Sequence, residues 1–531
     1  MSKNKKYNHW ADRIALRIIN TRPKKEMYIC AAGISPSGSV HIGNFRDVAT
    51  IFFVSKALRD LGKKVSLIFS WDEFDRFRKV PKNIPNTFEE YIGRPYTSIP
   101  DPFGCHKSYA QHFENEFCQA MQSFGINLEY RYQSEMYKSG CYTNGIITAL
   151  KYREKIFHIL SDFRTKKEYK DKREDYYPIT IYCKSCGKDT TKVKKLSDDC
   201  KMIFYTCKCG NKENLFIEND GKNIKLPWKI DWAMRWMHEK VDFEPGGKDH
   251  ATPGGSYTVS KRISEEIYNY QAPIFQGYEF VGIVGATSKM SGSSGLSITP
   301  KEILKVYQPE IILWQFSKYA PNKAFKISLG EEVLRQYDEF DRAMSSVNTG
   351  KASAQTIRNL EFSFIDRKEI PPIPFRQLSS FSTIVQKNLK VMEEIFDRIG
   401  TPYKEKEFRD RFEKSEYWQK KYSPDTAIEL LKNPNHIFFS KLEIEEKEWV
   451  NNLCHILKTQ KINFEYLTKV LYSIPKNENL NEKDNKLRQK KFFSIIYMLM
   501  IGKDTGPRLA TFLIALDKNT VIKFLCFNYK D

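Results

Sequence analysis

The stretch PSGSVHIGN occupies residues 36–44, between a predicted strand and a predicted helix. The strand is expected at residues 27–33, which end in small side chains. The helix is expected at residues 42–61, where apolar residues recur at helical spacing. A strand, a tight turn and a helix in this order indicate the first unit of an α/β sheet.

This turn has the chemistry of a phosphate-binding site. A helix that begins just after it offers unpaired N–H groups and a positive dipole, and Gly38 and Gly43 let a nucleotide approach the backbone. His41 can donate a hydrogen bond to a phosphate oxygen that gains charge in a transition state. An ordinary helix cap with a surface histidine explains the same letters, so both interpretations stay open at this point.

The sheet continues beyond this unit. Residues 65–69 are rich in β-branched and apolar side chains and follow Gly62, which favours a parallel strand reached by a crossover. The α/β pattern stops at a charged run, residues 166–175, and returns at 226–237 and at 278–284, where we expect a buried strand. We therefore predict a Rossmann-like parallel sheet that is split by an insertion.

The second half of the chain is predicted to be all-helical. After the prolines at 371 and 372, amphipathic stretches appear at residues 381–399, 442–459 and 491–501. The expected domains are a first catalytic half at 1–165, an insertion at 166–225, a second catalytic half at 226–305, a connecting helical region at 306–370 and a helical domain at 371–531.

Composition restricts the class of protein. The 531 residues are too many for one core, and 86 Lys and Arg against 65 Asp and Glu give a net charge of +21, which favours a polyanionic partner. A lysine-rich bias without a partner explains the charge as well.

The apolar runs are too short to cross a bilayer, and most of the 11 cysteines are scattered, as in reduced cytoplasmic proteins. We expect a cytoplasmic monomer without membrane contact.

A second motif, SKMSGSSG, occupies residues 288–295, directly after the strand expected at 278–284. It is rich in hydroxyl groups and contains one lysine, Lys289. Such a segment can close over a triphosphate and neutralise the pyrophosphate as it leaves, without a nucleophilic side chain. A Ser/Gly linker is the alternative, but the two motifs in this order are harder to dismiss.

The two motifs, HIGN and KMSGS, resemble the signature sequences of class I aminoacyl-tRNA synthetases. WKIDW at 228–232, FEPGGKDH at 243–250 and GGSY at 254–257 resemble the lysyl-specific class I enzymes in particular. The resemblance implies that lysine attacks ATP in the presence of Mg²⁺ to give lysyl-adenylate, which is transferred to tRNA(Lys), and that the helical half reads the anticodon. Activation that depends on bound tRNA, as in related class I enzymes, is compatible with the resemblance.

The same resemblance assigns roles to single residues. His41, Asn44 and Lys289 are the expected catalytic residues, acting on phosphate charge. The expected ATP-binding residues are Pro36, Gly38, His41, Gly43, Asn44, Lys289, Met290 and Ser291. The sequence departs from the general class I pattern at two positions. Gly292 stands where a second lysine is usual, which puts the catalytic load on Lys289, and Asn44 stands where a second histidine is commoner.

A lysine substrate needs a counter-charge for its ε-ammonium group and gains from aromatic faces. Asp231, Trp228, His250 and Tyr278 are the candidates, although a tryptophan-rich segment is usually core. The resemblance favours Trp228, His250 and Tyr278, and it places Gly33 and Ser35 at the α-amino end of the substrate.

Four cysteines have the spacing of a metal site. Cys183 and Cys186 form one pair, Cys207 and Cys209 form another, and each pair is followed by glycine. Two thiolate pairs separated by about twenty residues suit a tetrahedral structural Zn²⁺ site with no water position. A redox pair would need a different setting. The short Cys-x-Cys half is unusual, which leaves Cys200 as a substitute ligand.

Two other functions remain compatible with the sequence. A class I synthetase for glutamate or cysteine would share both motifs and differ in the amino-acid site. A non-catalytic zinc- and RNA-binding relative would keep the fold, but it would not need His41 and Lys289.

Overall fold

The computed structural model describes residues 8–163, 173–284, 298–363, 373–385 and 388–527. The chain divides into two compact units. The amino-terminal unit comprises Met1–Ile327 and Ala352–Ile365, and the carboxy-terminal unit comprises Ser328–Lys351 and Asp366–Asp531. The connecting region expected at 306–370 is thus shared between the two units.

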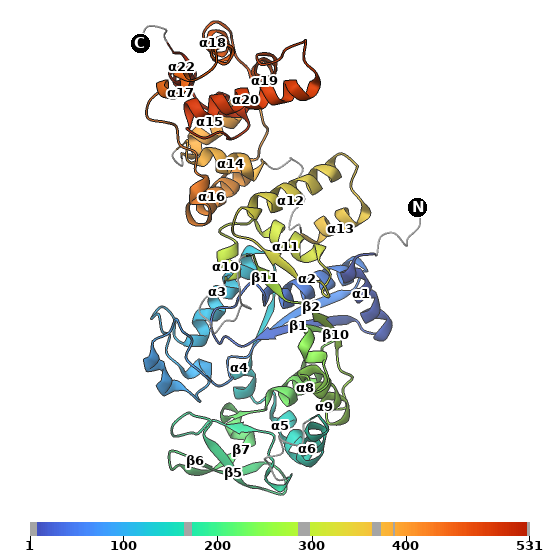
Figure 1. Ribbon diagram of the computed structural model, residues 1–531. Helices are drawn as coiled ribbons and strands as arrows, with labels where there is room; N and C mark the ends of the chain where they lie inside the picture. Colours follow the sequence, from blue (N-terminus) through green and yellow to red (C-terminus); the bar gives the residue numbers. More distant parts are fainter. Residues whose placement is uncertain (1–7, 164–172, 285–297, 364–372, 386–387, 528–531) are drawn as a thin grey trace. The chain divides into compact units, whose positions relative to one another are not determined.

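A five-stranded parallel sheet forms the centre of the amino-terminal unit, with strand order β10-β9-β1-β2-β3 (Figure 1). The strands are β1 (Met27–Ile34), β2 (Lys64–Trp71), β3 (Glu129–Tyr132), β9 (Phe243–Gly247) and β10 (Ile274–Tyr278). The predicted parallel α/β core is confirmed. Neighbours β1 and β9 meet at Cys30 and Phe243, far apart in the sequence.

Two helices near the amino terminus pack against this sheet or against each other. Helix α2 (Phe45–Asp60) packs along β1, β2 and β9 through an almost fully buried face, and α1 (Trp10–Thr21) packs against α2. Helix α2 begins three residues later than predicted, with Asn44 as its N-cap residue. The residues from His41 to Asn44 form turns instead, which keeps the HIGN motif ahead of the helix.

Short helices fill the connection from β2 to the insertion. They are the 3-10 helices η2 (Asn86–Tyr91) and η3 (Tyr96–Ser98), and the α-helices α3 (Tyr109–Ser123), α4 (Gln133–Lys138), α5 (Thr143–Lys151) and α6 (Arg153–Asp162). A separate aromatic core forms around the start of α3, with Phe77, Tyr96, Tyr109 and Phe113 buried together.

The insertion folds around a small antiparallel sheet. Strands β5 (Thr191–Leu196), β6 (Met202–Cys207) and β7 (Lys212–Phe216) pair in that order, after the short helix η5 (Arg173–Asp175). Strand β4 (Thr180–Ile181) precedes these strands and pairs with β8 (Ile224–Lys225), which follows α7 (Ile217–Asp220) and η6 (Gly221–Asn223). The chain then re-enters the main domain through α8 (Trp228–Glu239), which packs against α9 (Ser256–Glu266).

The strand predicted at 278–284 is wrong as a single element. The main sheet ends at Tyr278, and β11 (Val281–Ile283) pairs instead with β12 (Phe325–Ile327). The break lies at Glu279 and Phe280, because Arg46 binds the Glu279 carbonyl at 2.8 Å and the side chain of Phe280 is turned outward. Helices α10 (Pro300–Ile303), α11 (Pro309–Lys318) and α13 (Ala354–Ser363) complete the unit.

The described part of the carboxy-terminal unit is helical, as predicted. Its helices are α12 (Glu332–Asn348), α14 (Phe375–Ser382), α15 (Leu389–Ile399), α16 (Glu405–Tyr422), η9 (Pro424–Thr426), α17 (His436–Ser440), α18 (Ile444–Thr459), α19 (Phe464–Ser473), α20 (Glu482–Met500), α21 (Leu509–Ala515) and α22 (Lys518–Leu525). Helices α14, α15, α16, α18, α19, α20, α21 and α22 contribute buried residues to one apolar core. The stretch predicted as one helix at 381–399 is two helices, α14 and α15.

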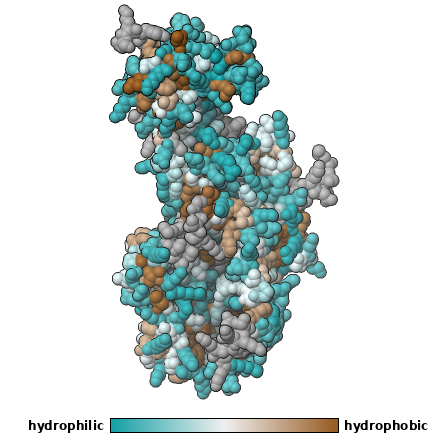
Figure 2. Space-filling view, viewed as in Figure 1, coloured by the Kyte–Doolittle hydropathy of each residue, from teal (hydrophilic) through white to brown (hydrophobic). Residues whose placement is uncertain are grey.

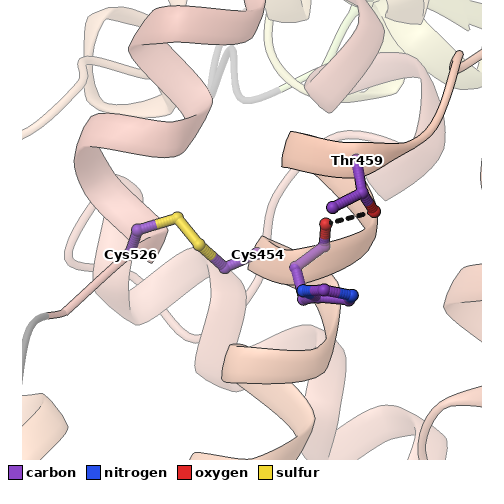
Figure 3. Close-up of a disulfide and its surroundings, with 4 residues drawn as sticks. Cys454, Thr459 and Cys526 are labelled. Carbon is purple, nitrogen blue, oxygen red and sulfur yellow. Dashed lines mark hydrogen bonds between the residues drawn. A yellow bond between two sulfur atoms is a disulfide. The ribbon is translucent and has the colours of Figure 1, made fainter.

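One disulfide departs from the expectation of reduced thiols. Cys454 in α18 and Cys526 at the end of α22 are joined, with their Cα atoms 5.6 Å apart (Figure 3). The two cysteines are separated by 72 positions, so only the packing of α18 against α22 reveals the pair.

The surface in Figure 2 is mostly hydrophilic, with hydrophobic residues in small separate groups. Among the described helices, none has the length and apolar character needed to cross a bilayer.

Candidate active site and metal-ligand clusters

The strand order reverses between β1 and β9. From β1 the chain goes to β2 and β3 on one side, and it later returns to build β9 and β10 on the other side. In open parallel sheets, ligands bind outside the carboxyl ends of the strands at this switch point. Gly33 and Ser35 lie at the carboxyl end of β1, and His250 follows β9 in the 3-10 helix η7 (Lys248–Ala251). The fold therefore gathers these predicted site residues at one edge.

The turn after β1 is held by its own backbone. The Ser37 N–H donates to the Ser35 carbonyl at 2.8 Å, and Pro36 and Gly38 are buried. The Asn44 N–H donates to His41 Nδ1 at 3.2 Å, which places the proton of a neutral ring on Nε2. This tautomer gives His41 a hydrogen-bond donor, as a phosphate ligand requires.

The second predicted motif, with Lys289, Met290 and Ser291, lies outside the described residues. The chain is described again from Ile298 onward, and the Ile298 carbonyl accepts a hydrogen bond from the Ile42 N–H at 2.8 Å. A residue three positions after the second motif thus contacts the first motif directly.

Gly33 and Ser35 are tightly fitted at the end of β1. A Cβ atom on Gly33 would lie 2.8 Å from the Ser70 carbonyl oxygen, so no larger residue fits without a backbone shift. The Ser35 hydroxyl donates to Asp75 Oδ2 at 3.2 Å. Asp75 Oδ1 in turn lies 3.3 Å from Lys225 Nζ, which links Ser35 to the group of charges described below.

A row of aromatic rings leads from α8 to η7. Trp228 stacks on Trp232 with ring centroids 4.9 Å apart, and Trp232 meets the His250 ring at 5.8 Å. The Arg235 guanidinium lies over Trp228 at 5.1 Å. Glu244 of β9 accepts a hydrogen bond from Trp236 Nε1 at 2.6 Å. Trp228 and His250 therefore belong to one contiguous aromatic group.

Tyr278 ends β10 beside Gly247, and its hydroxyl donates to Asp47 Oδ2 at 2.7 Å. Asp47 is in the first turn of α2. Burial raises the pKa of the Asp47 carboxyl to about 8, although the Tyr278 hydrogen bond opposes this shift. Sequence reasoning missed Asp47, because it reads as an ordinary acidic residue in a first helical turn.

Asp231, a candidate ligand for the substrate ammonium group, lies in the first turn of α8 among charges of the protein itself. It is 0% exposed, Lys225 donates to its Oδ2 at 2.7 Å, and Tyr137 donates to its Oδ1. Arg235, which also pairs with Asp72 at 2.6 Å, lies 3.6 Å from the same Oδ2. Both oxygens of Asp231 have partners inside the protein, which argues against the expectation that it receives a substrate ammonium group.

The sequence as a whole identifies the family. Residues 8–364 match the family described as tRNA synthetases class I (K), and this match covers more than half of the chain. The chain belongs to this family. The matched segment contains the switch-point edge, the insertion and every described active-site residue named above.

The similarity to individual proteins extends over both units. The chain is 36% identical to the lysine–tRNA ligase of Pyrococcus horikoshii, over 97% of this chain and 99% of the relative. It is 35% identical to the lysine–tRNA ligase of Treponema pallidum, over 97% of both chains. A solved glutamate tRNA ligase from Elizabethkingia meningosepticum is 11% identical, with a TM-score of 0.44 over 94% of this chain and 98% of that one, a likeness too weak to carry an argument.

The four predicted metal ligands of the insertion come together. The sulfur atoms of Cys183, Cys186, Cys207 and Cys209 all lie within 4.8 Å of one another, and two of the pairs are 3.7 Å apart. A tetrahedral site with Zn–S bonds of about 2.3 Å requires sulfur separations of about 3.8 Å. The cluster therefore has the size of a Zn²⁺ site.

The surroundings of these sulfurs act in different directions: burial and the neighbouring thiols raise the pKa of Cys186 to about 12, whereas hydrogen bonds lower the pKa of Cys207 although burial opposes this. Burial raises the pKa of Cys183, but N–H groups of Cys186 and Ser185 outweigh it and lower the pKa to about 6. Asn211 also donates to the Cys183 sulfur at 3.5 Å. Cys200, the proposed substitute ligand, is not in the cluster, and its sulfur lies 4.0 Å from the Asp198 carbonyl.

A second ligand cluster was not recognised in the sequence. One atom each from Asp101, Cys105, His106 and His112 lies within 4.8 Å of the others. The Cys105 sulfur is 3.1 Å from His106 Nδ1 and 3.3 Å from His112 Nδ1, and Asp101 oxygens lie 3.7 and 3.4 Å from the same nitrogens. The signal was the spacing Asp-x3-Cys-His-x5-His, which lacks the paired cysteines of a familiar zinc motif.

Proposed function

We propose that the protein is a lysine–tRNA ligase, which activates L-lysine with ATP and transfers it to the 3′ end of tRNA(Lys). The observation that supports this proposal most strongly is the 36% sequence identity to a lysine–tRNA ligase over nearly the full length of both chains. The switch-point edge, where an α/β sheet binds nucleotides, supports the same function.

ATP is proposed to bind at the turn formed by Pro36, Gly38, His41, Gly43 and Asn44. The Nε2–H of His41 and the amide of Asn44 would donate to phosphate oxygens as the lysine carboxylate attacks the α-phosphorus. Lys289, Met290 and Ser291 are proposed to act on the leaving pyrophosphate, and the contact between Ile298 and Ile42 supports this. Bound Mg²⁺ would offset phosphate charge, and no protein nucleophile is needed.

Lysine is proposed to bind between the end of β1 and the aromatic row. Gly33 and Ser35 would hold the α-amino end, and Trp228, His250 and Tyr278 would line the side chain. Asp231 is not included, since Lys225 and Arg235 already use its charge.

Zn²⁺ is proposed to bind Cys183, Cys186, Cys207 and Cys209 in a structural role. Four sulfur ligands complete a tetrahedral site and leave no position for a catalytic water. The bound ion would join the segment around Cys183 to the end of β6 and to the turn that follows β6. The small sheet alone would hold these segments together only weakly.

The carboxy-terminal unit is proposed to bind the anticodon arm of the tRNA. It contains a cleft of about 750 Å³ whose lining includes Arg335, Arg376, Lys503 and Arg508 alongside Glu331 and Asp338. Basic side chains around a cleft suit the phosphate backbone of RNA.

We also propose that the protein is a monomer and that it acts in the cytoplasm.

Aminoacylation of tRNA with each amino acid tests the function. We expect lysine to be attached to tRNA(Lys), and ATP–pyrophosphate exchange with tRNA present to depend on lysine but not on glutamate or cysteine. His41→Ala should lower the rate by about 10²-fold or more, with exposed His158→Ala as the matched control. Exchange with glutamate or cysteine alone would favour the alternative specificity, and no exchange with any amino acid would favour a non-catalytic relative.

Metal analysis tests the zinc site separately. The double variant Cys207→Ser/Cys209→Ser should bind about one Zn²⁺ less per chain than the unaltered protein. Cys141→Ser, at an exposed free cysteine, is the control. Equal zinc content in all three proteins would refute the site.

A further inference from the structure

Asp47 has a carboxyl group that no cation of the described residues neutralises. Asp47 is in the first turn of α2, is partly buried, and accepts a hydrogen bond at Oδ2 from the Tyr278 hydroxyl at 2.7 Å. Its neighbour Arg46 donates to backbone carbonyls instead. Burial and the charge of Glu244 raise the pKa of the Asp47 carboxyl to about 8. A positive charge placed beside Asp47 would therefore be stabilised.

Other acidic side chains near the carboxyl edge of the sheet are already paired or are exposed. The buried cations Lys225 and Arg235 pair with three aspartates, Asp72, Asp75 and Asp231. Glu244 accepts a hydrogen bond from Trp236 and is stabilised by the charge of Arg235. Asp249 is exposed, so water screens its charge. Among these groups, Asp47 is the one best placed to receive a positive charge from a ligand.

The aromatic row described above leads toward Asp47. The ring of His250, which ends the row, lies against Gly246, where an added Cβ atom would be 3.3 Å from its Cδ2. The next residue, Gly247, is the partner of Tyr278 in the sheet. The Tyr278 hydroxyl binds Asp47, so ring faces and a carboxyl group follow one another along this edge.

The spacing of the strands fits the length of a lysine molecule. Gly33 and Ser35 lie at the end of β1, and β10 is the second strand from β1 in the sheet. Neighbouring strands are about 4.8 Å apart, so the separation is about 10 Å. An extended lysine molecule covers this distance when a hydrogen bond is added at its ε-ammonium group.

We propose that Asp47 is the counter-charge for the ε-ammonium group of lysine and that it selects lysine over neutral amino acids of the same length. The inference rests on the proposed function and assigns a specificity-determining residue to it. Trp228 and His250 would pack along the methylene groups of the substrate, and Tyr278 would hold the carboxylate in place. The attraction is strong because water screens a partly buried pair less than an exposed one.

Binding of lysine should also change the protonation of Asp47. An adjacent ammonium group favours the carboxylate, so below pH 8 the carboxyl gives its proton to the solvent as lysine binds. Within the described residues, the titratable groups that act on Asp47 are Tyr278 of β10 and Glu244 of β9. Burial raises the pKa of Tyr278 well above its usual value, so this hydroxyl stays protonated and remains a donor.

Asp47→Asn tests the counter-charge, because it removes the charge and keeps the shape. We expect the KM for lysine in pyrophosphate exchange with tRNA present to rise about 10²-fold. The KM for ATP should stay nearly unchanged. The competitive inhibitor 6-hydroxy-L-norleucine has a hydroxyl in place of the ammonium group, so its Ki should be similar for the variant and the unaltered protein.

Glu279→Gln is the matched control for this variant. It removes an equal charge next to Tyr278, but the Glu279 carboxylate pairs with exposed Lys248. Its KM for lysine should equal that of the unaltered protein. An unchanged KM for lysine in Asp47→Asn would overturn the proposal. An equal rise in the Ki of 6-hydroxy-L-norleucine would overturn it as well, because it would mark a disturbed site instead of a lost charge.

Calorimetry of lysine binding gives a second readout that a purely structural role would not change. Titrations near neutral pH in phosphate and in Tris, which differ in heat of ionisation, report the protons released. We expect the unaltered protein and Glu279→Gln to release up to about one proton per lysine bound, and Asp47→Asn to release none. Equal release by all three proteins, or no release by the unaltered protein, would contradict the proposal.

The exchange assay also separates this inference from the proposed function. Lysine-dependent exchange that Asp47→Asn leaves unchanged would overturn this inference and keep the function. An unaltered protein without lysine-dependent exchange would overturn both.

Discussion

Asp231 carries a buried charge whose partners belong to the protein itself. Replacing it with the isosteric Asn would leave Lys225 and Arg235 without their shared counter-charge. We expect Asp231→Asn to lower the free energy of unfolding by about 3–5 kcal/mol, measured by denaturant titration. Glu465→Gln, in an exposed pair with Lys469, should leave it essentially unchanged. An unchanged stability with a raised KM for lysine would restore Asp231 as a substrate ligand.

His9 makes the amino-terminal unit sensitive to acid. Its Nδ1 accepts a hydrogen bond from the Ala11 N–H at 3.2 Å, and its Nε2 lies 2.9 Å from the Ser317 carbonyl, so the folded protein needs the neutral ring. Burial lowers the pKa of His9 to about 4 from its ordinary value of 6.5. The unfolded chain then binds more protons between these values, and stability rises with pH across that window.

The sign of this effect is testable with His9→Asn. We expect the unaltered protein to lose on the order of 3 kcal/mol of stability as pH falls from 6.5 to 4, by the size of the shift. His9→Asn should flatten this part of the profile, since Asn does not titrate and can still cap α1. Exposed His158→Asn should keep the original slope. Parallel profiles for the protein and His9→Asn would contradict the assignment.

At the scale of elements, the sequence predicted the features that are determined by residues close together in the chain. The unit formed by β1, the HIGN turn and α2 was predicted because its strand, turn and helix signals are consecutive. The pairing of Cys183 and Cys186 with Cys207 and Cys209 followed from their spacing. The elements from β4 to β8 were not predicted, because the small sheet of the insertion is organised by antiparallel pairing with little apolar periodicity.

Features that depend on distant contacts could not be predicted. The stretch 278–284 has the composition of one strand, and only the hydrogen bond from Arg46 to the Glu279 carbonyl shows why it divides into two. Asp231 has the chemistry of a lysine ligand, and only tertiary contacts with Lys225 and Tyr137 show that its oxygens are used. The second ligand cluster likewise becomes visible only when α3 brings His112 to Asp101.

The disulfide between α18 and α22 should stabilise the carboxy-terminal unit. Closing a loop across 72 positions restricts the unfolded chain, and such links usually contribute about 2–4 kcal/mol. We expect Cys454→Ser/Cys526→Ser to lose stability of this order under non-reducing conditions, and dithiothreitol to lower the melting temperature of the unaltered protein only. Titration of the denatured, unreduced protein that finds all 11 cysteines as free thiols would refute the link.

At the scale of the whole molecule, the net charge of +21 favours phosphate contacts in the proposed complex with tRNA. Lys and Arg that neutralise phosphates release counterions, so the logarithm of the binding constant falls linearly with the logarithm of the salt concentration. We expect the Kd for tRNA(Lys) to rise at least about tenfold between 50 and 200 mM KCl, which corresponds to only a few phosphate contacts. The Kd for ATP should change much less, and a salt-independent Kd for tRNA would contradict a phosphate-based interface.

The pairing of β1 with β9 also matters while the protein is being made. Cys30 meets Phe243 across the sheet, so the ribosome must add 213 further residues before β1 receives its second neighbour. At about 5–20 residues per second this takes roughly 10–40 s, during which the free edge of a nascent strand is open to other chains. Production of this enzyme should therefore depend on holdase chaperones more than that of a protein whose strands pair in the order of synthesis.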